Sequence, residues 1–296
     1  MKALRLILPA LGCLVWSLPA AACTNVFLVD GGVRLIGANL DCSNVFPRIW
    51  FVPAAGDQHG RYCYGTDENQ LIAEGGVNDR GLFIGVNALN ADTGWRADPM
   101  LPDWETWEGW FGTGVPDGIL ARCARVAEAE AVFGSYNLFT LNRVKFLVAD
   151  AGGASVVVEW YDGGLRFLRR GAAGFHVATN VVESAYAGQQ MSCERFRIAR
   201  RMLAGDQALP ATPATLDEVR AVLSATHLEF QTPTILSTVC DLVTGELAIY
   251  YFHDFEQPLR YNLREELARE RHGGLVGEMV AVKPYVATVY ERTRGR

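Results

Sequence analysis

The residue with the clearest potential for chemistry is Cys23, which follows a run of alanines and precedes Thr24 and Asn25. The residues before it begin with two basic side chains, continue with an apolar run over 6–18 and end in small residues. This is the layout of a cleavable secretion signal. At about 13 residues, the apolar run is too short to span a bilayer. The sequence therefore predicts that residues 1–22 are a signal peptide and that the mature protein is periplasmic or secreted.

Cleavage after Ala22 would leave Cys23 with a thiol and a free α-amine on the same residue. An α-amine titrates at about 7.7 to 8.0, so that a useful fraction is uncharged at neutral pH. The uncharged amine can take the proton of the neighbouring thiol. Cys23 is therefore predicted to be a nucleophile that carries its own base.

Two other interpretations of Cys23 compete with this one. A lipoprotein cysteine would be acylated during export, which would block the thiol and the amine, although Ala20 stands where such signals usually have a larger aliphatic residue. An ordinary buried or disulfide-bonded cysteine could also lie near the cleavage point by chance. The rest of the chain has to distinguish these three cases.

The composition limits the class of protein. The chain has 296 residues, of which 50% are hydrophobic and 20% charged, so it can bury a large core. Its net charge is −6, and the signal contributes two basic and no acidic side chains, which disfavours a nucleic-acid partner. No repeat, linker or low-complexity tract divides the mature chain, so residues 23–296 are expected to form a single domain.

The cysteines and histidines show no metal-site spacing, so no metal site is predicted. Seven cysteines are present, and Cys13 leaves with the signal. In an oxidising compartment the remaining six could form disulfides, and Cys42 with Cys63 is one candidate pair. Sequence alone does not set the connectivity.

Hydrophobic patterns and turn residues predict a mixture of strands and a few helices. Strands are expected over 25–30, 33–41, 48–53, 81–89, 144–149, 154–160, 165–168, 175–180, 234–241 and 246–253, and a polar loop over 58–69. Helices are expected over 117–133, 192–204 and 215–227, the last opened by a capping box of Thr215 with Glu218. This order indicates an α+β domain in which helices cover antiparallel sheets.

Aromatic residues are concentrated in a proline-punctuated segment, 95–111. One interpretation is a lid that packs on its own domain. The other is a wall for the apolar group of a ligand, which makes four side chains candidates for substrate binding: Trp104, Trp107, Trp110 and Phe111.

Four polar residues near element ends could assist a nucleophile that attacks an acyl carbon. Asp41 ends a predicted strand, Asn87 interrupts an apolar one, Asn180 ends another, and Arg195 opens a helix. A buried amide such as that of Asn87 must find partners, because an unsatisfied one costs about 1–3 kcal/mol. Asp41 could instead cap a turn, the asparagines could be satisfied core amides, and Arg195 could belong to a solvated basic helix face.

Several short motifs occur in a fixed order along the chain, and the ordered set resembles that of a known family. They are Cys23-Thr24, the G-x-N-x-D of 37–41, the N-x-x-G-L of 78–82 leading to Asn87, Thr179-Asn180, and Arg195-Phe196. The ordered set resembles the N-terminal-nucleophile hydrolases of the choloylglycine hydrolase and penicillin V acylase type, over Cys23 to about Phe252. The related N-acyltransferases of penicillin biosynthesis are similar over the first hundred residues.

The resemblance implies an αββα four-layer sandwich that hydrolyses a linear amide bond without a cofactor. It implies that Cys23 is the nucleophile, that Asp41 orients its amine, that Asn87 and Asn180 bind the oxyanion or position the amide, and that Arg195 lies near the thiol. Many relatives have arginine where this chain has Ala38. Arg34 or Arg48 could supply the missing positive charge.

The expected function is therefore that of a secreted N-terminal cysteine amidohydrolase acting on a small-molecule N-acyl compound. An acyltransferase on the same scaffold and a lipid-anchored binding protein acylated at Cys23 are the alternatives. No membrane insertion is expected after signal cleavage, and self-association into a homo-oligomer is compatible with the sequence.

Overall fold

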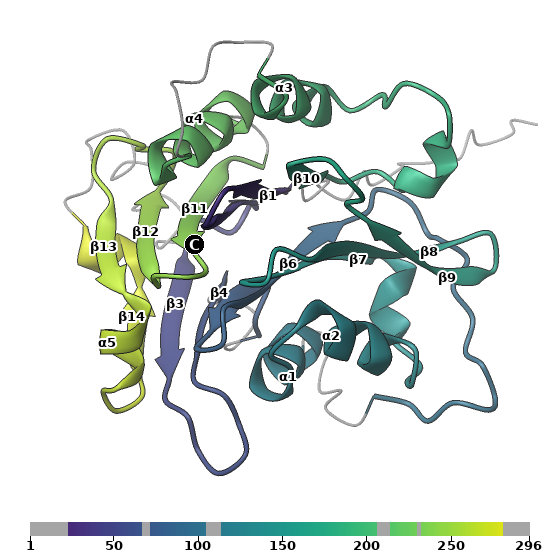
Figure 1. The fold of residues 1–296 in the computed structure, drawn as a ribbon, viewed down its shortest axis with the longest axis horizontal. Coiled ribbons are helices and arrows are strands. Elements are labelled where there is room, and N and C mark those ends of the chain that lie inside the picture. The colour runs from purple at the N-terminus through teal and green to yellow at the C-terminus, as the bar shows by residue number, and fades with distance from the viewer. Residues whose placement is uncertain (1–22, 67–71, 105–113, 206–213, 230–231, 281–296) are drawn as a thin grey trace, which may run out of the picture.

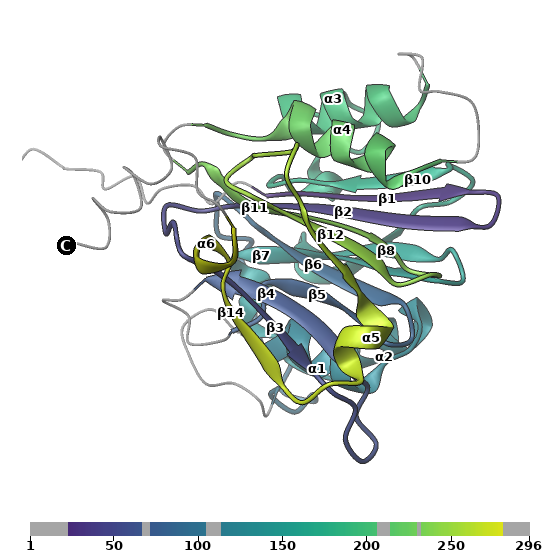
Figure 2. The ribbon, with the colours of Figure 1, turned by 90° about the vertical axis from the view of Figure 1, so that its left-hand side faces the viewer.

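The structure is a computed structural model that describes residues 23–66, 72–104, 114–205, 214–229 and 232–280 (Figure 1). These residues form two stacked antiparallel sheets with helices on the outer face of each (Figure 2). The predicted αββα sandwich is thus the observed architecture.

The six-stranded sheet has the order β10-β1-β2-β11-β12-β13 and is covered by α3 and α4. Its strands are β1 (Thr24–Asp30), β2 (Val33–Asp41), β10 (Phe175–Ala178), β11 (Thr234–Asp241), β12 (Glu246–Tyr251) and β13 (Leu259–Asn262). The covering helices are α3 (Glu194–Leu203) and α4 (Leu216–Thr226).

The eight-stranded sheet has the order β14-β3-β4-β5-β6-β7-β8-β9 and is covered by α1 and α2. Its strands are β3 (Pro47–Val52), β4 (Arg61–Thr66), β5 (Gly75–Asn78), β6 (Leu82–Ala88), β7 (Val144–Asp150), β8 (Ser155–Tyr161), β9 (Gly164–Arg169) and β14 (His272–Leu275). The covering helices are α1 (Gly114–Arg122) and α2 (Val126–Phe133). The remaining helical elements are the short helices α5 (Leu263–Leu267) and α6 (Val276–Met279) and the 3₁₀ turns η2 (Phe139–Asn142) and η3 (Glu183–Tyr186).

The hairpin of β1 and β2 decides which side chains enter the space between the sheets. Gly31 opens its turn with a φ of +52°, a conformation that suits glycine. In β1, Val26 and Leu28 pack toward α3 and α4, whereas Phe27 lies in the core between the sheets, as does Cys23 just ahead of the strand. The alternation of a strand therefore places Cys23 inside the sandwich.

Most predicted strands are confirmed, but the expected polar loop over 58–69 is wrong. Residues 61–66 form β4, an inner strand of the eight-stranded sheet. Its aromatic and cysteine side chains at Tyr62, Cys63 and Tyr64 are buried on both faces, and the polar residues around them hid the strand in the sequence. The short elements β5, β13, β14, α5 and α6 were also not predicted.

The expected helix over 117–133 is two helices, α1 and α2. The break has a specific cause in Asn78, whose Nδ2 donates hydrogen bonds to the carbonyl oxygens of Leu120 at 2.8 Å and Cys123 at 2.7 Å. These carbonyls lie at the end of α1, where a helix has no partners of its own for them. The predicted capping box of Thr215 and Glu218 at α4 is confirmed.

The suggested Cys42–Cys63 disulfide is not formed, because Cys63 is a buried free thiol. Among the described residues, no group of three or more His, Cys, Asp or Glu side chains is arranged to hold a metal ion. None of the described helices has the length and apolar character needed to cross a membrane.

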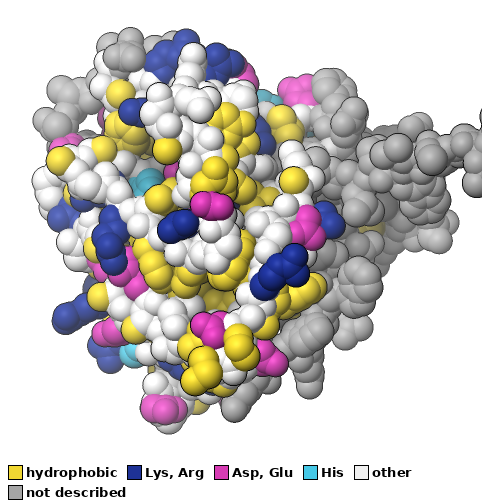
Figure 3. All heavy atoms as spheres, turned by 90° about the vertical axis from the view of Figure 1, so that its right-hand side faces the viewer, with side chains coloured by type: hydrophobic (Ala, Val, Ile, Leu, Met, Phe, Trp, Pro, Cys, Tyr) yellow, Lys and Arg dark blue, Asp and Glu magenta, His cyan; other side chains and the backbone are white. Residues whose placement is uncertain are grey.

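Aromatic side chains contact one another near β8, where Trp95 packs edge-on against both Phe139 and Trp160. Figure 3 shows the face at this side of the molecule, on which hydrophobic side chains gather near the centre and charged side chains of both signs surround them.

Candidate active site

The site is built around Cys23, which lies just ahead of β1 and is only 5% exposed. Its carbonyl oxygen accepts two hydrogen bonds, from Asn87 Nδ2 at 3.1 Å and from an Arg195 guanidinium nitrogen at 2.9 Å. Asn87 comes from the eight-stranded sheet and Arg195 from α3, so three separate elements converge on one residue. While residues 1–22 remain attached, the nitrogen of Cys23 is a peptide amide, because Ala22 precedes it.

Asn87 is a satisfied amide with a fixed orientation. Its Oδ1 accepts a hydrogen bond from Asn25 Nδ2 at 2.8 Å, which leaves Nδ2 to donate to Cys23 and to the carbonyl oxygen of Ala178 at 3.3 Å. Asn25 stands two residues after Cys23 on the same face of its strand. The predicted proximity of Asn87 to Cys23 is therefore what the structure shows, and Asn25 is an additional member of the site.

Arg195 links most of the predicted residues through one guanidinium group. The nitrogen that contacts Cys23 also donates to Thr24 Oγ1 at 3.0 Å and lies 3.5 Å from Asp41 Oδ2, and the other terminal nitrogen donates to Asn180 Oδ1 at 2.8 Å. Its side chain is 15% exposed. The solvated basic face of α3 is formed instead by its exposed neighbours, Arg197, Arg200 and Arg201.

Asp41 is fully buried at the end of β2. The hydroxyl of Thr234 donates a hydrogen bond to Oδ1, and Arg195 approaches Oδ2. Burial raises the pKa of Asp41 to about 7, because it disfavours the charged form more than Thr234 and Arg195 stabilise it. The carboxyl group is thus poised to gain or lose a proton near neutral pH.

The thiol of Cys23 is held in its protonated form. Its pKa is raised well above the ordinary value, mainly by burial and then by the negative charge of Asp41, with a smaller contribution from Glu74. The backbone N–H of Asp41 and the charge of Arg195 act in the opposite direction. The charge of Arg195 thus favours the thiolate but is outweighed, so the nucleophile needs a base.

Asn180 lies just beyond β10, within hydrogen-bond distance of Arg195. Its Nδ2 donates a hydrogen bond to the carbonyl oxygen of Ala88 at 2.6 Å, and its Oδ1 accepts from Arg195. The chain segments that carry Asn87 and Asn180 are therefore joined directly. All five predicted catalytic residues, Cys23, Asp41, Asn87, Asn180 and Arg195, lie in one connected group.

The aromatic segment is only partly described. Trp104 is buried against Gly118 of α1, and its ring packs edge-on against Tyr136 at 5.2 Å between centroids. These are contacts with its own domain. Trp107, Trp110 and Phe111 lie outside the described residues, and a role of this segment in substrate binding stays a prediction.

Arg34 does not replace the arginine that many relatives have at the position of Ala38. Its guanidinium donates to the carbonyl oxygens of Gly31 and Val33 at the turn of the hairpin, at the end of β2 far from Asp41. Ala38 itself is buried. Its cross-strand neighbour Thr238 is hydrogen-bonded to Tyr62 across the two sheets, at 3.0 Å between the hydroxyl oxygens.

Asn25, Glu74 and Thr234 also belong to the site and were not predicted, whereas Thr24 was part of the predicted Cys23-Thr24 motif. Asn25 could have been found, because residues two apart on a strand share a face. Thr234 carried no such signal. It reaches Asp41 because β11 pairs with β2, a contact between segments far apart in the chain.

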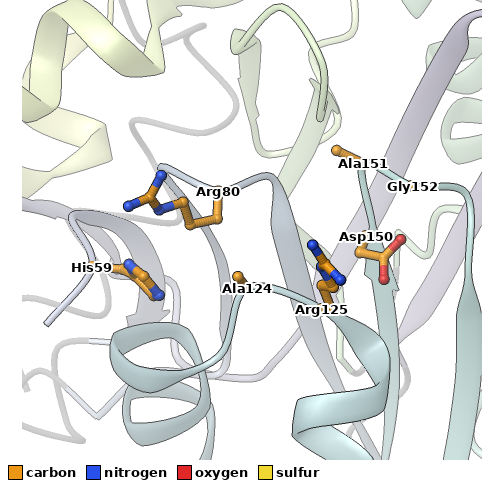
Figure 4. A pocket seen from close by; sticks show the side chains of 7 residues that line it. All are labelled: His59, Arg80, Ala124, Arg125, Asp150, Ala151 and Gly152. Carbon is orange, nitrogen blue, oxygen red and sulfur yellow. The ribbon is translucent and has the colours of Figure 1, made fainter. Parts of the chain in front are cut away.

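A separate cavity of about 450 Å³ lies at the other end of the β6–β7 pair, where Leu82 pairs with Asp150. Figure 4 shows the side chains that line it. Asp79 lies near both His59 and Arg80, and Asp150 accepts backbone hydrogen bonds, so acidic groups offset the basic ones there. This cavity takes no part in the arrangement around Cys23.

Solved structures with the same arrangement of elements identify the fold. Conjugated bile acid hydrolase from Clostridium perfringens matches with a TM-score of 0.66 and 13% identity over 88% of this chain and 99% of the other. Penicillin V acylase from Agrobacterium tumefaciens matches with a TM-score of 0.57 and 16% identity over 77% and 82% of the two chains. This chain has the fold of the N-terminal-nucleophile hydrolases.

A Caenorhabditis elegans orthologue of N-acylethanolamine-hydrolyzing acid amidase shares the fold, with a TM-score of 0.51 and 18% identity over 74% of this chain and 92% of the other. No protein-family model matches the sequence, and no curated protein matches it either. At these identities the likeness establishes the N-terminal-nucleophile fold, and the chemistry has to be argued from the site.

Proposed function

We propose that the mature protein is an amidohydrolase that uses Cys23 as an N-terminal nucleophile to cleave the linear amide bond of an N-acyl compound. One observation carries this proposal. A single guanidinium, that of Arg195, contacts Cys23, Thr24 and Asn180 and approaches Asp41, while Asn87 contacts Cys23 from the other sheet. The amide hydrolases with the same fold support the same class of reaction.

The reaction begins when the free α-amine of Cys23 takes the thiol proton and the sulfur attacks the acyl carbon. The carbonyl oxygen becomes an oxyanion, for which the amide groups of Asn87 and Asn180 are the candidate donors. Since Asn87 Nδ2 already donates to the carbonyl oxygens of Cys23 and Ala178, it would have to share or exchange one of these hydrogen bonds with the substrate. A preorganised donor of this kind contributes about 2.7–4 kcal/mol to lowering the barrier. The ammonium then gives its proton to the departing nitrogen, which leaves as a free amine, and a thioester remains. Water attacks the thioester and releases the acid.

Asp41 would hold the amine in place. Its carboxyl group is buried beside Cys23, and its pKa is about 7 while residues 1–22 remain attached. Removal of residues 1–22 creates a positive charge within reach of this carboxyl group each time the amine is protonated. A nearby cation favours the carboxylate, so processing should convert Asp41 into a charged partner of the amine.

The burial of Cys23 bears on the two alternative functions. A diacylglyceryl group on this sulfur would have to fit into the core between the sheets, which favours catalysis over lipid anchoring. An acyltransferase would use the same residues and differ only in passing the thioester to an amine instead of water. The leader over 1–22 supports a periplasmic or secreted location as part of this proposal.

The test combines processing with turnover. We would purify wild type, Cys23→Ser and Cys23→Ala from the exporting host, measure their intact masses, and follow release of free amine from acylated amino acids, acylated lactones, penicillin V and conjugated bile acids. The proposal requires a mature chain that starts at unmodified Cys23 and turnover that Cys23→Ala abolishes. Retained turnover in Cys23→Ala, or a lipid adduct on the wild type, would refute it. A new amide formed with an added amine would identify a transferase instead.

A further inference from the structure

A lysine lies fully buried between the sheets, close to the site but without a role in the chemistry described above. Lys145, in β7, has no exposed side-chain surface, and its ammonium lies 2.7 Å from Glu183 Oε1 and 3.9 Å from Glu159 Oε2. Glu159, in β8, is fully buried as well. Buried charges are retained only where good partners compensate for lost hydration. The ion pairs of Lys145 with Glu183 and Glu159 are therefore a defined part of the interior.

The carboxylate of Glu159 fixes a specific piece of backbone. Its two oxygens accept hydrogen bonds from the backbone N–H groups of Glu183 at 2.9 Å and Ser184 at 2.7 Å. These N–H groups belong to the first residues of η3. Lys145 holds the side chain of Glu183 at the same time. The start of η3 is therefore attached to the eight-stranded sheet through both its backbone and a side chain.

The attached segment carries Asn180. On one side of Asn180, Ala178 is paired with Asn25 in the six-stranded sheet. On the other side, Glu183 is held by Lys145 and Glu159. The short stretch 179–182 is thus fixed at both ends, and Asn180 has little freedom to move relative to the thiol.

Asn87 lies directly across from Lys145 in the eight-stranded sheet. Asn87 of β6 and Lys145 of β7 are directly paired across the strands, so their side chains leave the same face of the sheet. Asn87 reaches Cys23 directly. Lys145 reaches the Asn180 segment through Glu183. The paired residues Asn87 and Lys145 can therefore set the distance between Asn87 and Asn180.

The neighbouring histidine does not add a second positive charge. His176 is hydrogen-bonded to Ser155 at 3.0 Å between Nδ1 and Oγ. Burial, together with the smaller effects of the charges of Lys145 and Arg170, lowers the pKa of His176 to about 4. Lys145 is therefore the cation that faces the two glutamates from β7.

We propose that Lys145 and Glu159 are positioning residues for the oxyanion donors, which they serve by fixing the segment that carries Asn180 relative to Asn87. This inference rests on the proposed amidohydrolase function for its kinetic consequence. Its structural part stands on the contacts of Glu183 and Ser184 alone.

The kinetic test is a double-variant cycle of Lys145→Met with Asn180→Ala. Lys145→Met should lower kcat by about 10- to 100-fold with little change in KM, the scale expected for displacement of a catalytic group by about 1 Å. The double variant should be no slower than Asn180→Ala alone, because Lys145 acts through Asn180. The rate of Cys23 alkylation by iodoacetamide should stay at the wild-type value. Independent, multiplicative losses in the double variant would overturn the proposal.

A second variant covers the case in which Lys145→Met does not fold. Glu183→Gln removes the negative charge that pairs with Lys145, at a side chain that is 12% exposed and so less costly to replace. It should show the same non-additivity with Asn180→Ala. The matched control is Arg169→Met, which breaks the exposed ion pair with Glu130 and should leave kcat unchanged. If the control lowered kcat as much as Lys145→Met, loss of any ion pair would explain the result and the proposal would fail.

Amide hydrogen exchange tests the structural part without any substrate. The N–H groups of Glu183 and Ser184 should exchange slowly in the wild type and much faster in Glu159→Gln, whose side chain has one acceptor oxygen where glutamate has two. Unchanged protection in Glu159→Gln would contradict the anchoring. If the wild type hydrolyses no N-acyl compound, the amidohydrolase function is refuted. If the N–H groups nevertheless lose protection in Glu159→Gln, the anchoring of the segment still holds.

Discussion

Asn87 of the eight-stranded sheet donates a hydrogen bond from Nδ2 to the carbonyl oxygen of Cys23, which leads into the six-stranded sheet, at 3.1 Å. The site is therefore formed by the stacking of the two sheets, and neither sheet contains it alone. Arg195, from the helix layer above, closes the group from a third direction. A change that alters how the layers pack should affect activity even where no member of the site is replaced.

The orientation of the Asn87 amide depends on Asn25, which gives a first prediction. In Asn25→Asp, a carboxylate would face Asn87 Oδ1 where an N–H group now donates. The Asn87 amide should turn over to present its Nδ2 to the new carboxylate, so that both the carbonyl oxygen of Cys23 and the proposed oxyanion would lose Asn87 as a donor. We expect kcat to fall by about 10²- to 10³-fold, the effect of losing one oxyanion donor.

The matched control makes the same chemical change at Asn262, the N-cap of α5, where aspartate serves equally well as a cap. Asn262→Asp should keep wild-type turnover. Kinetics on one substrate, with both variants checked for folding by thermal melting, measure the difference. Wild-type kcat in Asn25→Asp would show that the orientation of the Asn87 amide is irrelevant to the reaction.

Arg195 should not be replaceable by lysine. A lysine is a compact charge and cannot reproduce the two-nitrogen contact by which Arg195 joins Cys23 and Asn180. Loss of one charge-assisted hydrogen bond should lower kcat/KM by about 10- to 100-fold. Arg197→Lys, on the solvated face of the same helix, is the control and should have no effect. Equal activity in the two variants would mean that Arg195 contributes only charge.

The local part of the site was predictable, and the distant part was not. The pattern after Cys23 predicted a hairpin, and the hairpin places Asp41 beside Cys23. The contact of Thr234 with Asp41 depends on the pairing of β11 with β2, which no local pattern encodes. The order of motifs supplied Asn180 and Arg195, because it identified a known fold, and elementary physical chemistry could not have brought them together.

The errors in the predicted elements have a similar origin. Residues 61–66 form a strand because the sheets bury Tyr62 and Tyr64, although their sequence neighbours are polar. The break between α1 and α2 is produced by hydrogen bonds from Asn78, a residue of β5. In both cases a tertiary contact decides the local structure.

The raised pKa of Asp41 predicts how stability depends on pH in a chain that retains a residue ahead of Cys23. The folded-state pKa is about 7, whereas an unfolded aspartate titrates at about 3.9. Between these values the folded state binds more protons than the unfolded state. The contribution of Asp41 to stability is therefore complete below about pH 4 and is lost as the pH rises through 7.

Urea unfolding at several pH values between 4 and 8 measures this effect. Relative to Asp41→Asn, the wild type should lose a few kcal/mol of unfolding free energy across the window, because each pKa unit corresponds to about 1.36 kcal/mol. Asp57→Asn, at an exposed turn, should retain the wild-type pH dependence. If Asp41→Asn showed that same dependence, the carboxyl group would not titrate as the structure indicates.

A single glycine inserted between Ala22 and Cys23, and left in place after processing, should nearly abolish turnover while the fold persists. The nitrogen of Cys23 would then be an amide, as it is before residues 1–22 are removed, and could not accept the thiol proton. Burial and the charge of Asp41 hold the pKa of this thiol far above its ordinary value, so it would remain protonated without that base. A general base contributes about 10²- to 10⁴-fold to the rate, and we expect a loss of that size. The comparison is kcat of the inserted form against a chain trimmed to Cys23, both verified by intact mass; equal rates would show that another group activates the sulfur.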